Sequence, residues 1–431
     1  MTKWIIQNTT TMKVLKIKDI VRTISITHKF DKDKLIAINT SDVENGIMHD
    51  GTLTAIEDLK GQFKKTVQKG DILFSEIRPA NRRFALVTKD DCADYVVSTK
   101  LMVLRKYNNE VGLRYFYYCL TNQPFLDMLQ RKAENRIGSF PQITFDLLSE
   151  YAFPVPSLSE QEKIANIIFS LDHKIALNKQ INDNLEAMAK QLYDYWFVQF
   201  DFPNEEGKPY KSSGRAMVWN EKLKREIPVG WSVKNLGQIA TSYQQGLIRS
   251  NNQLSTDSKY GYLKMGDLDG KGQYTLQGLT RTNATNEEVD LYSLHKGDFL
   301  INVRNSKEIV GKTCLIGYVE RNTLYNHMLV RLDFKDVSTF YMNLLFNSEF
   351  MYKALDGLKQ GTTTVIALYQ SDLYRLPILI PAPYVMEQFS KITDSILDQK
   401  EIISHEIAEL TKQRDELLPL LMNGQAVVNS D

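Results

Sequence analysis

Lys69-Gly70-Asp71, followed by apolar residues and Arg78, returns about 227 residues later as Lys296-Gly297-Asp298, followed by apolar residues and Arg304. Chance matches would scatter over many offsets, whereas two further matches keep this offset to within about a residue. The chain therefore contains two copies of one unit, which predicts one task performed at two places. The further matches are Pro154-Val155-Pro156 with Glu160-Gln161, repeated as Pro381-Ala382-Pro383 with Glu387-Gln388, and Leu171-Asp172 with Lys174, repeated as Leu397-Asp398 with Lys400.

The composition is that of an ordinary globular protein with roughly two to four domains. Of the 431 residues, 43% are hydrophobic and 24% are charged, and no apolar run approaches the roughly 18 residues that cross a bilayer. The start of the chain also lacks the long apolar segment of a secretory signal. We therefore expect a cytoplasmic protein without a membrane span.

The cysteines and histidines give no sign of a metal site. Cys92, Cys119 and Cys314 show no C-x-x-C spacing, so we expect reduced thiols. The six histidines are dispersed, and none has a second ligand at the spacing of a zinc site. Neither a structural nor a catalytic zinc is expected.

The charge distribution permits phosphate binding without establishing it. A formal net charge of +1 gives no support for a nucleic-acid partner when it is averaged over the chain. Basic residues exceed acidic ones from Lys13 to Pro154, whereas acidic residues dominate from Pro383 onward. The positive charge therefore lies on the globular parts.

Each copy is predicted to be an irregular α+β domain followed by a long helix. Short runs of β-branched and aromatic residues between turn residues indicate strands, such as Asp71-Ile72-Leu73-Phe74 and Asp298-Phe299-Leu300-Ile301. A helical stretch near Arg114 to Arg131 interrupts the strands of the first copy. The predicted segments are an N-terminal extension (1–12), a first globular domain (13–155), a central helix with linker (156–227), a second globular domain (228–382) and a distal helix with tail (383–431).

The first long helix is expected to begin just after Pro154 and Pro156, which disfavour helix before them. Ser157 with Glu160, or Ser159 with Glu162, can form a capping box there. Apolar residues then recur at spacings of three and four, which places them in one stripe over roughly 50 Å. The stripe consists of Ile164, Ile168, Leu171, Ile175, Ile181, Leu185, Met188, Leu192 and Tyr195.

The second long helix has the pattern of a coiled coil. Burying one stripe stabilises such a helix by less than the ordering of its backbone costs, so each stripe needs a partner. We expect the two helices to pack antiparallel with a globular domain at either end. The alternative is that each helix folds back on its own domain. The seam consists of Phe389, Ile396, Ile403, Leu410 and Leu417 at intervals of seven, flanked by Ile392 and Leu421.

Aromatic residues are concentrated at the end of the first helix, before a linker or extended loop at 200–214 that is rich in proline, glycine and charge. Their density exceeds what one exposed helix end requires. They either close an intramolecular core or form a docking surface for another protein, and both alternatives remain open. The candidate docking residues are Tyr193, Tyr195, Trp196, Phe197, Phe200 and Phe202.

The sequence contains no recognisable catalytic motif. Phosphate-binding, dinucleotide-binding, nucleophile-elbow and zinc-protease patterns are all missing. The Asn-Pro-Pro-aromatic or Asp-Pro-Pro-aromatic signature of a DNA amino-methyltransferase is missing too. These absences favour a binding protein.

Basic and amide side chains gather at matched positions of the two domains. Arginine can bind guanine O6 and N7 together, asparagine and glutamine match adenine N6 and N7, and lysine serves phosphate. The alternative is that these are ordinary solvated turns. The candidates of the first copy are Arg78, Asn81, Arg82, Arg83, Arg136, Ser139 and Gln142. Those of the second copy are Gln244, Gln245, Arg304, Asn305, Ser306, Lys307, Lys312, Gln360, Thr362, Thr363 and Thr364, with Arg304 to Lys307 expected in the turn equivalent to that of Arg78 and the two glutamines just after the first strand.

Three stretches carry a resemblance to a known family. They are Leu192-Tyr193-Asp194-Tyr195-Trp196-Phe197 through Gly207-Lys208-Pro209-Tyr210 to Gly230-Trp231, then Gly70-Asp71-Ile72-Leu73-Phe74 through Arg83, and Leu417-Leu418-Pro419-Leu420-Leu421-Met422-Asn423-Gly424-Gln425. In this order they are similar to the central region, one target recognition domain and the end of the distal helix of specificity (S) subunits of type I restriction-modification systems. The resemblance covers essentially the whole chain, and the central stretch is specific to the family.

The resemblance implies a non-catalytic chain whose two target recognition domains each read one half of a split site in double-stranded DNA. It implies two methyltransferase (M) subunits, docked on the helical regions, that bring S-adenosylmethionine for DNA methylation. Restriction (R) subunits would bring ATP, magnesium and DNA cleavage, and this chain would hold no cofactor. Two linked readers on one DNA face should contact half-sites about a helical turn apart, with the helices as a ruler. The two loop sets differ, so the half-sites should differ.

Two competing hypotheses remain at the level of the sequence. A DNA methyltransferase or nuclease with an unrecognised site would bind a cofactor or turn over substrate as an isolated chain. A purely structural coiled-coil scaffold would keep its DNA affinity when Arg78, Arg82 and Arg83 are replaced by alanine, and would fail to assemble when the helix seam is changed.

Overall fold

The computed structural model describes residues 13–59, 61–134, 142–276, 278–320, 322–361 and 366–422. The chain divides into two compact units, Met1–Ala176 with Ala408–Asp431 (unit 1) and Leu177–Ile407 (unit 2). Both boundaries fall inside the two long helices, α4 (Leu158–Tyr193) and α10 (Pro383–Met422). Each unit therefore combines one globular domain with parts of both helices.

Unit 1 is built on two four-stranded sheets, in the orders β2-β11-β8-β9 and β6-β3-β10-β7. A two-stranded antiparallel ribbon of β1 and β12 ties the start of the domain to its end. The strands are β1 (Lys13–Lys16), β2 (Val21–Thr23), β3 (Lys34–Ile38), β4 (Val43–Glu44), β5 (Ile47–Met48), β6 (Thr52–Ala55), β7 (Phe63–Lys65), β8 (Ile72–Ser75), β9 (Phe84–Leu86), β10 (Tyr95–Ser98), β11 (Leu101–Lys106) and β12 (Ala152–Val155). The helices are η1 (Ile17–Asp19), η2 (Thr40–Asp42), η3 (Ile56–Leu59), η4 (Pro79–Asn81), α1 (Leu113–Thr121), α2 (Gln123–Glu134) and α3 (Phe145–Ser149).

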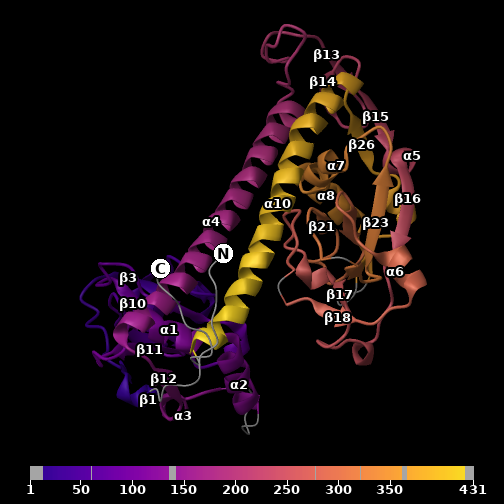
Figure 1. Cartoon of the computed structure of the whole chain (residues 1–431). Coiled ribbons are helices and arrows are strands. Elements are labelled where there is room, and N and C mark those ends of the chain that lie inside the picture. The colour runs from indigo at the N-terminus through magenta and orange to yellow at the C-terminus, as the bar shows by residue number, and fades with distance from the viewer. Residues whose placement is uncertain are drawn as a thin grey trace. The chain divides into compact units, whose positions relative to one another are not determined.

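Unit 2 repeats this plan with the sheet order β16-β23-β19-β21, the sheet β18-β17-β22 and the ribbon β15-β26. Helices α7 and α8 lie between the four-stranded sheet and α10 (Figure 1). The sheet, these two helices and α10 all contribute side chains to one core. The strands are β13 (Met217–Asn220), β14 (Arg225–Pro228), β15 (Ser232–Asn235), β16 (Ala240–Gln245), β17 (Tyr260–Leu263), β18 (Thr280–Thr282), β19 (Phe299–Asn302), β20 (Arg304–Asn305), β21 (Thr313–Leu315), β22 (Leu324–Tyr325), β23 (Leu329–Phe334), β24 (Gln360–Gly361), β25 (Ile366–Ala367) and β26 (Pro377–Ile380). The shorter helices are η5 (Asp194–Val198), α5 (Leu236–Ile239), η6 (Asn251–Gln253), η7 (Met265–Asp267), α6 (Asn286–Tyr292), α7 (Thr339–Phe346), α8 (Glu349–Leu358) and α9 (Gln370–Leu373).

The repeated Lys-Gly-Asp motif is a tight turn that starts the central strand of each domain. Gly70 and Gly297 have φ angles of 89° and 90°, a region in which a side chain would be strained. Asp71 then accepts the backbone N–H of Gln68 at 2.9 Å, and Asp298 accepts that of His295 at the same distance. This agreement confirms the internal duplication at the level of individual hydrogen bonds.

The two long helices pack antiparallel, as predicted. Arg414 donates to Asp172 at 3.0 Å within unit 1, and Lys400 donates to Glu186 at 2.7 Å within unit 2. The sequence numbers of the partners rise on one helix as they fall on the other. The α+β class and the antiparallel helix pair are therefore both confirmed.

Three residues of the predicted stripe do not lie in the seam. Tyr195, 39% exposed, lies beyond α4 in η5, and the other two lie on α4 itself. Ile181 and Met188 are 45% and 59% exposed, whereas Asn178, Leu185 and Ala189 are buried. Each of these two exposed residues follows a buried one by three positions, which turns its side chain about 60° away from the seam on an α-helix. The flanking Ile392 of α10 is likewise 43% exposed, while Phe389, Ile396 and Leu410 are buried as predicted.

Ser157 and Glu160 form the first of the two capping boxes considered above. The Ser157 N–H donates to Glu160 Oε2 at 3.0 Å, and the Glu160 N–H donates to Ser157 Oγ at 3.3 Å. Ser157→Ala should lower the free energy of unfolding of unit 1 by about 1 kcal/mol. Urea unfolding of the purified chain measures this loss, and Ser159→Ala is the control. A larger loss for the exposed Ser159 would contradict this assignment.

No helix in the described part of the chain is long and apolar enough to cross a membrane.

Candidate nucleic-acid interface

The candidate DNA-binding turn of unit 1, residues 78–83, follows β8 and is held in an unusual backbone conformation. Pro79–Asn81 form the short helix η4, flanked by Arg78 and Arg82 at φ angles of 46° and 53°. Non-glycine residues in this region cost roughly 1 kcal/mol each or more, and such strain is concentrated at functional sites. The backbone N–H of Ala80 donates to Gln130 of α2 at 3.1 Å, which braces the turn. The Arg78 and Asn81 side chains are exposed.

Arg82 and Arg83 make contacts within their own domain. Arg82 donates through Nε to Asn45 at 2.7 Å and through Nη1 to Gln123. Burial, with the nearby charge of Arg414, lowers the pKa of the Arg82 guanidinium. Arg83 lies 3.4 Å from the Glu44 carboxylate. Arg78 is exposed, whereas Arg82 and Arg83 are half-buried. Exposure therefore makes Arg78 the stronger candidate for reading a base, and the sequence could not separate it from its neighbours.

Gln142 lies beside this turn, with its backbone bridged to Ile77. Its side-chain amide donates to Glu76 Oε2 at 3.0 Å, and Lys65 Nζ stands 4.0 Å from Glu76 Oε1. Glu76 and Lys65 are therefore additional polar groups at the turn. No sequence signal marks them, because Glu76 simply follows an apolar strand. The candidates Arg136, Ser139, Thr362, Thr363 and Thr364 lie outside the described residues.

The repeat in the structure pairs different residues from those first matched. Ile143 N donates to Glu76 O at 2.8 Å, and Leu368 N donates to Val303 O at 2.8 Å. Glu76 and Val303 are therefore equivalent, so Arg304 takes the place of Ile77 and Asn305 that of Arg78. Arg78 and Arg304 therefore stand one position out of register, which is within the one-residue tolerance of the sequence offset, because the backbones of the two copies stay in register while the arginines occupy successive positions.

Arg304 and Asn305 form strand β20, paired with β25, rather than the predicted turn. Lys359 Nζ donates to the backbone oxygen of Lys307 at 3.0 Å, which fixes the following loop, while the Ser306 N–H donates to Asn305 Oδ1 at 2.7 Å. The Arg304 and Lys307 side chains are exposed. Lys312 lies against Gly270, where an added Cβ would stand 2.9 Å from Lys312 Cε.

Gln244 and Gln245 are the last residues of β16, rather than following it as predicted. Gln244 accepts a hydrogen bond from Arg331 Nη2 at 2.5 Å and donates to Leu291 O at 3.1 Å. Both ends of its amide are therefore used inside the domain. Gln245 is exposed.

Exposed and half-buried polar groups lie on adjacent segments at this end of the unit 2 domain. The His327 N–H donates to Leu247 O at 3.1 Å, close to Gln245, and Val303 N donates to Met328 O at 2.9 Å, beside Arg304. Burial and the charge of Arg304 lower the pKa of His327. Its Nδ1 is buried and has no hydrogen-bond partner among the described residues. Gln360, on β24, donates to Asp372 Oδ2 at 2.8 Å. His327 was missed because a single dispersed histidine gives no sequence signal.

Most of the aromatic residues at the end of α4 are buried, which contradicts their prediction as a docking surface. Tyr193, Trp196, Phe197, Phe200 and Phe202 are at most 4% exposed and belong to the core of unit 2. The Phe202 ring stacks on Trp231 at 5.0 Å, so this part of the predicted linker is packed. Aromatic side chains of this size gain most when they are buried against one another. The intramolecular alternative holds for these five, and Tyr195, 39% exposed, is the remaining docking candidate.

Nothing in the described part of the chain forms a group of three or more histidine, cysteine or acidic side chains that could hold a metal ion.

Two copies of one α+β domain, each with exposed basic and amide groups beyond its central strand, define a two-module recognition protein. Residues 10–187 and 228–412 match the model of the type I restriction modification DNA specificity domain, once per copy. The chain belongs to this family, whose members are non-catalytic specificity subunits.

The chain is also similar to individual relatives and solved structures. The chain is 29% identical to the HindI specificity subunit of Haemophilus influenzae, over 96% of this chain and 99% of that protein. It is 26% identical to the MjaIX specificity subunit of Methanocaldococcus jannaschii, over 72% and 68%. Solved structures include the type I S subunit of M. genitalium (14% identical, TM-score 0.49, covering 96% and 98%) and the HsdS subunit of Thermoanaerobacter tengcongensis (16%, TM-score 0.39, covering 96% and 97%).

Proposed function

We propose that this chain is the DNA sequence-recognition subunit of a type I restriction-modification enzyme and that each domain reads one half of a bipartite site. The observation that carries the proposal is the double family match on duplicated domains. In each copy, exposed polar side chains follow the same central strand, β8 or β19. The paired helices would set the length of the unread gap.

The exposed side chains suit the edges of bases. The guanidinium groups of Arg78 and Arg304 can donate to guanine O6 and N7, and the amides of Asn81, Gln245 and Gln360 can pair with adenine. Since the two sets differ in type and in position, the two half-sites should differ in sequence. These base contacts are part of the proposal.

Two methyltransferase subunits are proposed to dock on the helices, and restriction subunits complete the enzyme in the cytoplasm. Within unit 2, Leu177, Ile181, Met188 and Tyr195 are 39% to 59% exposed. The spacing of the first three puts them on one face of α4, and Tyr195 follows in η5. S-adenosylmethionine, ATP and magnesium would belong to the partners. The coiled-coil scaffold and the enzyme with an unrecognised site are the alternatives.

A genome-wide methylation map tests the function. A methylation-free host would express this chain with its neighbouring methyltransferase subunit, and the control host would lack this chain. A split motif with a fixed gap, modified only when the chain is present, is expected. Methylation that is independent of the chain, or that occurs at a short continuous site, would remove the two-reader proposal.

Replacing Arg78 by alanine should weaken DNA binding by roughly 1 to 3 kcal/mol and relax one position of one half-site, because a bidentate base contact is lost. The Arg304→Ala variant should relax the other half-site. Binding titrations with systematically varied duplexes at fixed salt measure both effects. Arg22→Ala, at an exposed position of β2, is the control for loss of a positive charge alone. A uniform loss over all sequences would show that Arg78 contacts phosphate rather than a base.

A further inference from the structure

Ile248 is an apolar side chain presented to solvent beside the polar groups of unit 2. It is 70% exposed, more than any other large hydrophobic side chain in the described part of the chain. It lies three residues after Gln245, in the loop between β16 and η6. A single exposed isoleucine in a flexible loop would need no explanation. The backbone on both sides of Ile248, however, is held firmly.

Leu247 anchors the loop on the N-terminal side of Ile248. Its side chain is buried at 5% exposure. Its backbone N–H donates to Tyr325 O at 2.8 Å, and its carbonyl oxygen accepts from the Tyr262 hydroxyl at 2.6 Å and from His327 N at 3.1 Å. The peptide that joins Leu247 to Ile248 is thus tied to two neighbouring segments.

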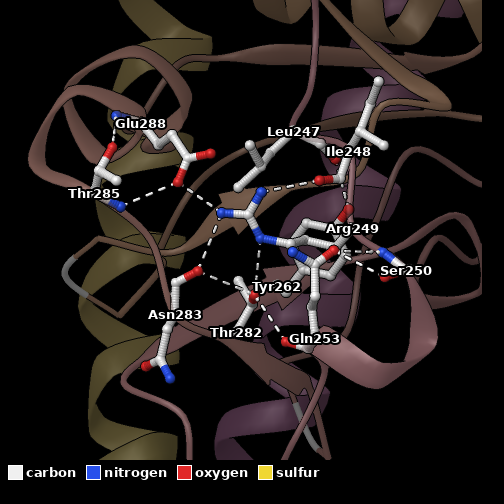
Figure 2. Close-up of polar contacts among 10 residues, drawn as sticks. All are labelled: Leu247, Ile248, Arg249, Ser250, Gln253, Tyr262, Thr282, Asn283, Thr285 and Glu288. Atoms are coloured by element: carbon white, nitrogen blue, oxygen red, sulfur yellow. Dashed lines mark hydrogen bonds and ion pairs between the residues drawn. The ribbon is translucent and has the colours of Figure 1, made fainter.

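Arg249 anchors the loop on the other side. Its guanidinium forms an ion pair with Glu288 at 2.6 Å and donates to Thr282 Oγ1 at 3.2 Å. It also donates to the carbonyl oxygen of Ile248 itself at 2.9 Å. The Arg249 side chain is only 10% exposed, so its bonds to Glu288 and Thr282 are partly shielded from water. Figure 2 shows the guanidinium at the centre of this network and the Ile248 side chain pointing away from it.

This construction pre-organises Ile248 for binding. When the backbone is already fixed, binding a ligand costs only the conformational entropy of the side chain. A flexible loop would also lose backbone entropy, and that cost would offset the favourable free energy of the contact. Polar side chains lie nearby. Gln245 is exposed three residues before Ile248, and the backbone N–H of the half-buried His327 donates to the Leu247 carbonyl oxygen. A base edge in the major groove can pair with an amide beside an apolar contact. The thymine methyl is the apolar group that the major groove presents.

We propose that Ile248 contacts a thymine methyl group in the half-site read by unit 2, and that Arg249 is its positioning residue. The proposal rests on the proposed function and deepens it. It adds an apolar specificity contact to a set that otherwise consists of polar groups. Arg249 acts through the loop, since its donors are committed to Glu288, Thr282 and the Ile248 backbone.

Deoxyuridine substitution tests the contact, because it removes the methyl group and leaves the base-pairing edge unchanged. The complex of this chain with its methyltransferase subunit would be titrated with duplexes of the mapped site. Each thymine of the half-site read by unit 2 would be replaced in turn. Wild-type binding should weaken about three- to tenfold at one position, as expected for a lost methyl contact. The Ile248→Ala complex should bind the thymine duplex that much more weakly and lose nothing further with uracil.

Leu53→Ala is the matched control, since Leu53 is 65% exposed on unit 1 and its loss should leave the uracil effect intact. The proposal is overturned if Ile248→Ala keeps the full discrimination, if no uracil substitution affects the wild type, or if that half-site contains no thymine. A split methylation motif obtained together with one of these results would leave the proposed function standing. Absence of a split motif would overturn both.

Discussion

Phe197→Ala is expected to lower the free energy of unfolding of unit 2 by about 3–5 kcal/mol. The Phe197 side chain is 2% exposed, and its ring centroid lies 4.8 Å from those of Tyr341 and Phe389. Trp231 packs against it at 5.8 Å. Truncation would leave a cavity among rings that come from three other segments, so little relaxation can fill it. Urea unfolding of the purified chain, followed by tryptophan fluorescence without any partner subunit, measures the loss.

The neighbouring Tyr195 provides the control. It is 39% exposed, so Tyr195→Ala should change the stability by less than about 0.5 kcal/mol. If Tyr195 is part of a docking surface, the same variant should weaken assembly with the methyltransferase subunit. The opposite pattern, with Phe197→Ala neutral for stability and harmful only to assembly, would restore the docking interpretation of the aromatic cluster.

The architecture could be predicted from the sequence because its signals are local or repeated. The offset between Lys69-Gly70-Asp71 and Lys296-Gly297-Asp298 requires no knowledge of tertiary contacts, and both glycines adopt the positive φ that such a turn needs. The seven-residue spacing of α10 likewise depends only on helix geometry. The stripe on α4 is harder to predict, because a spacing of three or four admits neighbours on either side of the seam. The spacing predicts Ile181 in the seam, whereas the structure buries Asn178 there and leaves Ile181 exposed.

The candidate site was harder to predict because availability depends on tertiary partners. Arg78 and Arg82 look equivalent in sequence, yet Arg78 is exposed while Arg82 is half-buried against Asn45 and Gln123, which are distant in the chain. Gln244 and Gln245 are adjacent, and only the first is held by Arg331. Strand alternation sends their side chains to opposite faces, so one packs inward and the other outward. The reading roles of the exposed members stay predictions.

Asp71→Ala is expected to destabilise unit 1 by about 3–5 kcal/mol, since it leaves a buried partner without its counter-charge. The Asp71 side chain is 0% exposed and binds Arg105 through both oxygens, at 2.7 and 2.8 Å. It also accepts the N–H of Gln68, which closes the turn before β8. The variant therefore removes an ion pair and a turn contact together. Thermal and urea unfolding measure the loss, and the transition of unit 2 should stay in place.

Asp298→Ala, the equivalent change in the second copy, should lower the free energy of unfolding by less. Comparing the two variants therefore tests whether the ion pair or the turn hydrogen bond causes the loss. Asp298 is 15% exposed and holds Arg331 through a single bond at 3.2 Å. Arg331 keeps Gln244 and the Ser293 carbonyl oxygen as partners when Asp298→Ala removes the carboxylate. If both variants lose the same stability, the shared turn contact dominates. If Asp71→Ala loses clearly more, the buried ion pair accounts for the difference, because the turn hydrogen bond has the same length in both copies.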